Sequence, residues 1–128
     1  MSYYFNKTVN QNFEEAIEKV TEELQKEGFG ILTEIDVKAT LKKKLDVDFR
    51  NYKILRACNT GYAHKALQSE SRIGTMLPCN VIVQENDEGK VEVAAVDPTA
   101  SMQAVENPGL ESIANEVRAK LHNVINNL

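Results

Sequence analysis

The distribution of apolar and polar positions predicts a strand and then a helix in the first part of the chain. Residues 3–9 alternate between the two sides of an extended segment, with Tyr3, Phe5 and Val9 on the apolar side. This period of two is typical of a strand with one buried face. Beyond it, apolar side chains recur at intervals of four, three and four, at Phe13, Ile17, Val20 and Leu24. That spacing predicts an amphipathic helix.

Both ends of this helix carry recognisable signals. Asn12 is a suitable N-cap, and Glu15, three residues later, completes a capping box. Gly28 is placed to adopt the left-handed conformation that ends many helices. We therefore expect the helix to lie between Asn12 and Gly28.

The middle of the chain predicts two more strands and two more helices. Residues 29–37 suit a strand with Ile31, Ile35 and Val37 on one face, and residues 38–45 suit a short helix whose lysines face solvent. Residues 52–58 form a third predicted strand. The helix after Cys58 presents an inner face made of Tyr62, Ala63, Ala66 and Leu67.

The last third of the chain predicts a β-hairpin and a long helix. Residues 76–85 and 90–97 are joined by four turn-forming residues, with Gly89 placed for a positive φ angle. Pro78 has no N–H for a ladder and is expected at a strand start or on an edge. Pro98 ends the second strand. Asn107 caps the final helix.

The predicted order is β-α-β-(α)-β-α-β-β-α. A hairpin combined with helical connections favours an α+β fold, with a mostly antiparallel sheet and helices packed on one face. No linker or repeat divides the sequence, so we expect a single domain over residues 1–128. The other face of the sheet is then either solvated or buried against a second subunit.

Charge and composition narrow the possible partners. The formal net charge is −4, which disfavours nucleic acid as the main partner. No segment resembles a signal peptide or approaches the roughly 20 apolar residues of a membrane span. We expect a cytoplasmic protein that binds neither membrane nor nucleic acid, with its two cysteines reduced.

Cys58 and Cys79 are the candidate reactive groups, and an asparagine follows each. Cys58 ends a predicted strand where a helix begins, and the positive end of a helix lowers a thiol pKa. The structural alternative is that both thiols fill buried gaps while Asn59 caps the helix. The thiols lie close together if the third and fourth strands are antiparallel, and a strand length apart if they are parallel.

Other chemistries have weaker support. Cys58, His64, Cys79 and His122 are the only thiol and imidazole ligands, and their spacing fits no short-loop zinc motif. The chain has no phosphate-binding glycine loop, no nucleophile elbow and no His-Glu-x-x-His. We therefore expect neither a metal nor a cofactor.

Three segments, "ILRACNTGYAHKAL", "IGTMLPCNVIVQENDEGKVEV" and "VDPTASM", resemble the domain-of-unknown-function family numbered 302, and the resemblance covers nearly the whole chain. It implies an α+β fold similar to that of TATA-binding proteins and a homodimer, with no established activity. The family commonly has proline where this chain has Thr60. The matching positions are Cys58, Asn59, Ala63, Leu67, Gly74, Leu77, Pro78, Cys79, Asn80, Val81, Asp97 and Pro98.

Three functional hypotheses follow. The first is a homodimer that binds a small molecule or a partner without catalysis, in a pocket near Cys58, Asn59, Thr60, Cys79 and Asn80. The second is a thiol-dependent redox enzyme or sensor that uses Cys58 with Cys79. The third is a purely structural dimerisation module whose interface is the solvated face of the sheet.

Overall fold

The structure is a computed structural model that describes residues 2–128, and it is built around one five-stranded sheet. The strand order is β1-β5-β4-β3-β2, and every neighbouring pair is antiparallel. The predicted α+β class with an antiparallel sheet is confirmed. The strands are β1 (Tyr4–Val9), β2 (Gly30–Asp36), β3 (Tyr52–Cys58), β4 (Cys79–Glu85) and β5 (Val91–Val96).

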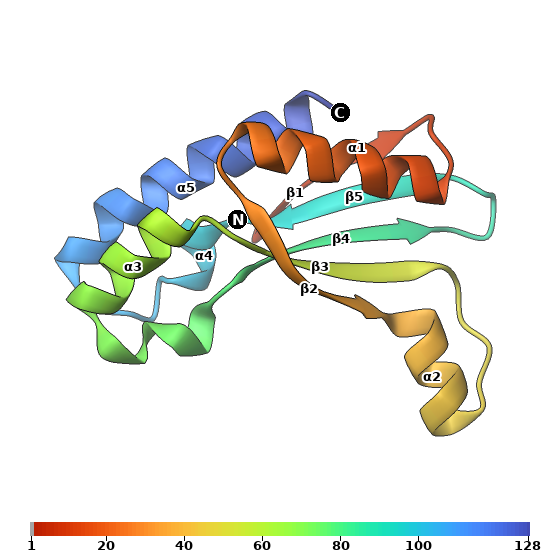
Figure 1. Cartoon of the computed structure of the whole chain (residues 1–128), viewed down its shortest axis with the longest axis horizontal. Helices are drawn as coiled ribbons and strands as arrows, with labels where there is room; N and C mark the ends of the chain where they lie inside the picture. Colours follow the sequence, from red (N-terminus) through yellow and green to blue (C-terminus); the bar gives the residue numbers. More distant parts are fainter. Residues whose placement is uncertain (1) are drawn as a thin grey trace.

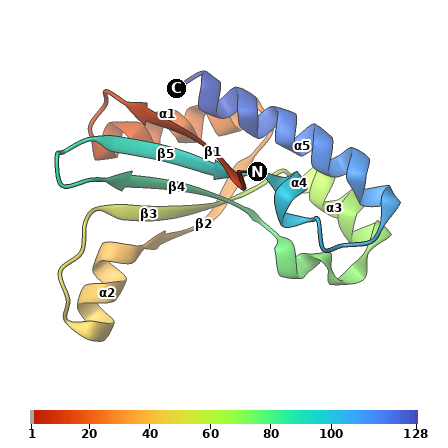
Figure 2. The same cartoon turned by 180° about the vertical axis from the view of Figure 1, so that it is seen from behind.

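Two long helices cover one face of the sheet. Figure 1 shows α1 and α5 on the same side of the strands, with α2 and α3 at opposite ends of the sheet, and Figure 2 shows this arrangement from behind. The helical segments are α1 (Phe13–Lys26), α2 (Val37–Leu45), α3 (Thr60–Ser69), the 3₁₀ helix η1 (Ser71–Met76), α4 (Pro98–Ser101) and α5 (Pro108–Asn126). Within the part of the chain that the structure describes, no long helix lies over the opposite face, which is called the open face below.

The main core lies between the sheet and these two helices. The inner side chains of β3, β4 and β5 pack against the apolar stripes of α1 and α5, as their periods of two and 3.6 predict. Completely buried members include Val20, Leu24, Leu55, Val81, Val83, Val93, Leu121 and Val124.

The capping signals predicted for α1 and α5 are confirmed. The Asn12 side chain accepts a hydrogen bond from the Glu15 N–H, and the Glu15 carboxylate accepts one from the Asn12 N–H. Gly28 follows α1 with φ of +88°, and Gly89 closes the β4–β5 turn with φ of +79°. Asn107 accepts from the Gly109 N–H at the start of α5.

Two details of the predicted faces are wrong. A bulge between Ile31 and Thr33 shifts the register of β2, so Ile31 pairs with Ala57 while Ile35 pairs with Ile54 on the open face. Ile31 and Ile35 therefore lie on opposite faces, and Val37 already belongs to α2. In α3 the buried residue is Ala66, whereas Leu67 is 43% exposed.

Candidate functional site

The antiparallel pairing of β3 and β4 brings the two cysteines to the same end of the sheet. Ala57 pairs with Cys79, and Cys58 is the next residue, at the end of β3. Both thiols are free and partly buried. Cys79 packs against the main core, as its shared parity with Val81 and Val83 predicts.

Burial raises the pKa of both thiols. The pKa of Cys58 lies above its ordinary value because its sulfur is partly removed from water. Burial, with a smaller contribution from nearby Cys58, raises the pKa of Cys79 to about 11. A nucleophilic or redox-active cysteine needs a lowered pKa, because the thiolate is the reactive form.

Asn59 precedes α3 but does not cap it with its side chain. Instead, its amide Nδ2 donates a hydrogen bond to the Glu27 carbonyl, at an N···O distance of 3.2 Å. The predicted capping role is therefore wrong, and the side chain ties the end of β3 to the C-terminal end of α1. Thr60, the first residue of α3, is exposed.

The predicted pocket residues are divided between two faces. Cys58, Asn59 and Cys79 line a narrow pocket between the sheet end and the helices, with a volume of about 30 Å³, enough for one or two water molecules. Asn80 is exposed on the other side of β4 and lines a separate hollow. Apolar side chains make up most of the narrow pocket, among them Phe29, Ala57, Tyr62, Ala63, Ala66, Leu77, Met102, Ile113 and Val117.

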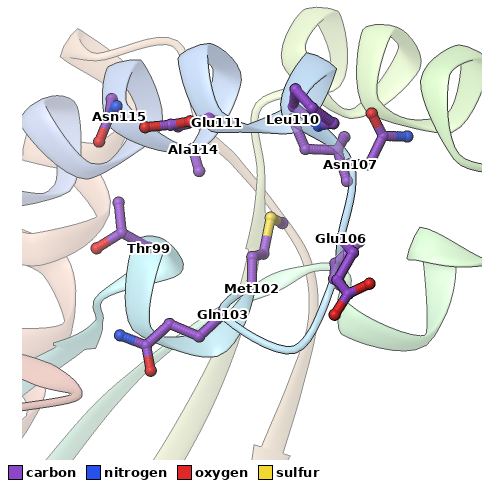
Figure 3. Close-up of a pocket in the computed structure, with 11 residues that line it drawn as sticks. Thr99, Met102, Gln103, Glu106, Asn107, Leu110, Glu111, Ala114 and Asn115 are labelled. Carbon is purple, nitrogen blue, oxygen red and sulfur yellow. The ribbon is translucent and has the colours of Figure 1, made fainter.

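A larger cleft of about 570 Å³ lies between α4, the loop that follows it and the first half of α5. Figure 3 shows Thr99, Met102 and Gln103 on one side of this cleft and Glu111, Ala114 and Asn115 on the other. The sequence pattern predicted no helix or strand between Pro98 and Asn107, so neither α4 nor the cleft was expected. The available signal was the pair of caps, Asp97 and Asn107, that fix both ends of this segment.

A third hollow, of about 310 Å³, opens on the uncovered side of the sheet beside η1. Arg56 and Asn80, which are paired across β3 and β4, contribute its polar side. Leu77, Pro78, Cys79, Pro98 and Met102 line both this hollow and the narrow pocket. Met102 also lines the large cleft.

An ion pair holds the start of α4 against α5. The Asp97 carboxylate accepts hydrogen bonds from the Thr99 N–H at 3.0 Å, the Thr99 hydroxyl at 2.7 Å and Arg118 Nε on α5 at 3.1 Å. Burial alone would raise the pKa of Asp97, but these hydrogen bonds outweigh it and lower the pKa. Asp97 thus fixes the turn from β5 into α4.

The predicted metal-ligand types do not come together. His64 and His122 are exposed on α3 and α5, and the His122 ring packs edge-on against Phe5 with centroids 5.1 Å apart. Within residues 2–128, no three histidine, cysteine or carboxylate side chains are grouped as a metal site. In the same range, no helix has both the length and the apolar composition needed to cross a bilayer.

Fold and site together define an α+β protein with one antiparallel sheet and a group of hollows at one sheet end. The chain belongs to the family described as domain of unknown function DUF302, whose model matches residues 5–128. The family resemblance drawn from the Cys-Asn and Asp-Pro segments is thereby confirmed.

A solved structure agrees with this assignment. The crystal structure of an uncharacterized conserved DUF302 protein from Bacillus stearothermophilus is similar, with 28% sequence identity and a TM-score of 0.91. The match covers 98% of each chain. The comparison with curated proteins found no match.

Proposed function

We propose that this protein is a cytoplasmic, non-catalytic binding protein that holds a small, largely apolar molecule at the sheet end where the cysteines lie. The observation that carries this proposal is the position of Met102, which lines all three hollows. A methionine side chain is unbranched and flexible, so it adapts readily to an occupant. Its movement would join the narrow pocket to a neighbouring hollow within the usual size range of ligand sites, about 300–1,000 Å³.

The thiols support binding rather than catalysis. Both pKa values are raised, so both groups are protonated at neutral pH and contribute weakly polar, adaptable surface. The narrow pocket has the composition of a ligand site, because apolar walls surround a few polar groups.

Titration with 1-hexanol, followed by amide ¹H–¹⁵N chemical shifts, tests this proposal. We expect saturable shifts concentrated at Ala66, Cys79 and Met102, which surround the narrow pocket. Ala114 lines both the cleft and the narrow pocket, so Ala114→Leu should fill the space and weaken binding. Ala63→Leu fills the pocket from α3 and serves as a second variant.

Ala119→Leu is the matched control, because Ala119 is exposed on the same helix as Ala114. It should bind 1-hexanol like the parent protein. Thermal unfolding of each variant establishes that it is folded. Shifts that do not saturate, that lie away from this sheet end, or that persist equally in both filling variants would refute the proposal.

We also propose that the open face binds a second copy of the chain. An apolar row crosses four strands there, because Ile35 pairs with Ile54, Ile54 with Ile82, and Ile82 with Ala94. Ile35 is 39% exposed, although it is a large apolar residue. A two-fold axis through this row would place the same apolar side chains from both copies against each other.

The open face of the sheet is too small to form a stable dimer interface by itself. Five strands about 4.8 Å apart, each about six residues long at about 3.3 Å per residue, give a flat area of about 480 Å². A stable interface buries about 800 Å² per partner, so α2 and η1 at the ends of the sheet would have to contribute.

Sedimentation velocity tests the homodimer. Ile82→Glu places a charge in the middle of the apolar row and should convert the dimer to monomer at micromolar concentration. Ala119→Glu adds the same charge on the exposed surface of α5 and should leave the dimer intact. A parent protein that sediments as a monomer, or two variants that behave alike, would rule out this interface.

A further inference from the structure

Arg56 differs from other arginines of the chain in its surroundings. It is partly buried near the end of β3 and pairs across the sheet with Thr33 on β2 and Asn80 on β4, neither of which is charged. Within residues 2–128, no ion pair or side-chain hydrogen bond involves its guanidinium group.

Two other arginines are engaged by neighbouring side chains. Arg118 Nε donates to Asp97 at 3.1 Å. Arg50 donates to Gln84 at 2.9 Å and lies over the Phe49 ring at 4.4 Å. Arg56 is therefore a half-buried cation whose hydrogen-bonding capacity is left for solvent or a ligand.

The hollow beside Arg56 has two chemically different sides. Arg56 and Asn80 contribute polar groups, whereas Leu77, Val96 and Met102 contribute apolar surface. Among the described residues that line it, none is acidic, although the protein carries a net charge of −4. The large cleft differs in this respect, since it is lined by Glu106 and Glu111.

We propose that this hollow binds the carboxylate of a small organic acid with an apolar chain. The planar guanidinium group of Arg56 donates two parallel hydrogen bonds to the carboxylate, and the Asn80 amide supplies a third donor. The apolar chain of the ligand lies against Leu77 and Met102, in the direction of the narrow pocket. One guanidinium group balances one carboxylate, whereas a phosphate dianion would keep an uncompensated charge.

This inference rests on the proposed function and specifies its ligand class. It does not require the second copy. Arg56 lies two residues beyond Ile54 along β3, so the hollow is at the η1 end of the open face rather than on the apolar row.

Parallel titrations with hexanoate and 1-hexanol at pH 7, followed by amide chemical shifts, test the inference. The two probes share one apolar chain and differ in the head group. A charge-assisted hydrogen bond to a partly buried arginine should make hexanoate bind about tenfold more tightly than 1-hexanol. Arg56→Gln should remove this difference by weakening the binding of hexanoate.

Arg72→Gln is the matched control, because it removes the same charge from an exposed position on η1. It should retain the preference for hexanoate. If 1-hexanol binds while hexanoate binds equally or more weakly, the carboxylate site is refuted and the proposed function stands. If Arg56→Gln and Arg72→Gln lose the preference for hexanoate equally, the carboxylate site is likewise refuted and the proposed function stands. Binding of neither probe overturns both the inference and the proposed function.

Discussion

The raised pKa of Cys79 predicts a slow and strongly pH-dependent reaction with alkylating agents. In a Cys58→Ser variant, Cys79 is the one remaining cysteine, since the chain has two. Burial and the nearby thiol raise the Cys79 pKa from an ordinary value of 9.0 to about 11. Burial is the larger cause and remains in this variant, whereas the smaller contribution of Cys58 is removed. At pH 7 a rise in pKa from 9.0 to about 11 lowers the thiolate fraction from about 1% to about 0.01%, so ionisation should slow alkylation of the variant by up to about 100-fold.

The assay is the rate of iodoacetamide modification against pH, measured by intact mass. The rate should rise through pH 7–10 without reaching a plateau, because the thiolate population keeps increasing below a pKa of about 11. Cys79→Ser reports on Cys58, which should react faster than Cys79 and more slowly than free cysteine. Both variants should react at the free-cysteine rate in strong denaturant. A midpoint near or below pH 7 for either thiol would refute this reasoning and support a redox role.

Three further predictions concern stability. Leu121 is completely buried, so Leu121→Ala should lower the free energy of unfolding by about 2–5 kcal/mol in urea denaturation; a loss below about 1 kcal/mol would contradict this packing. Asp97→Asn should cost about 1 kcal/mol at pH 7. The folded pKa of Asp97 is lowered from 3.8, so its contribution to the free energy of unfolding is present above that pH and is lost as the pH falls further. The stabilities of the parent protein and the variant should therefore converge in acid. A stability difference that does not change with pH would exclude this account. Gly28→Ala should cost about 1–2 kcal/mol, because φ is +88° and a Cβ would lie 3.1 Å from Asn59 Nδ2. Gly30→Ala is its control, because a Cβ at Gly30 would meet no other atom within 4 Å. This substitution should leave the free energy of unfolding nearly unchanged in the same denaturation experiment.

Local signals in the sequence predicted those elements whose ends are set by short-range chemistry. The capping box at Asn12 and the positive φ at Gly89 depend only on neighbouring residues, and both occur as expected. The bounds of β3 also match the prediction, because its apolar run ends at a helix start. The short turn between residues 85 and 90 predicted that β4 and β5 form a hairpin, and this pattern favoured the antiparallel sheet that the structure shows.

The errors concern features that depend on distant partners. The bulge in β2 moves Ile35 to the open face, and this shift is visible only in its pairing with β3. Asn59 has the residue type of an N-cap, but the end of α1 offers its amide the Glu27 carbonyl instead. The predicted lowering of the Cys58 pKa considered the helix start alone, whereas partial burial dominates in the folded chain.

The candidate site was predicted in part. Cys58 and Cys79 do lie at one sheet end, because β3 and β4 are antiparallel. The strand period of two could have separated Asn80 from Cys79, since successive residues point to opposite faces. The hollows around Met102 could not be predicted, because they depend on how the segment between β5 and α5 folds back against the sheet.

The position of β1 has a consequence for how the chain assembles. Strand β1 is the first in sequence, yet it pairs with the last, and the Asn6 amide donates to a Glu92 carboxylate 86 residues away. Such distant pairing makes loop closure slow, so β1 should dock late, after the hairpin has formed. Until β1 docks, the backbone N–H and C=O groups along one edge of β5 are unpaired and can hydrogen-bond to a strand of another molecule. The chain is therefore most prone to aggregation in this interval.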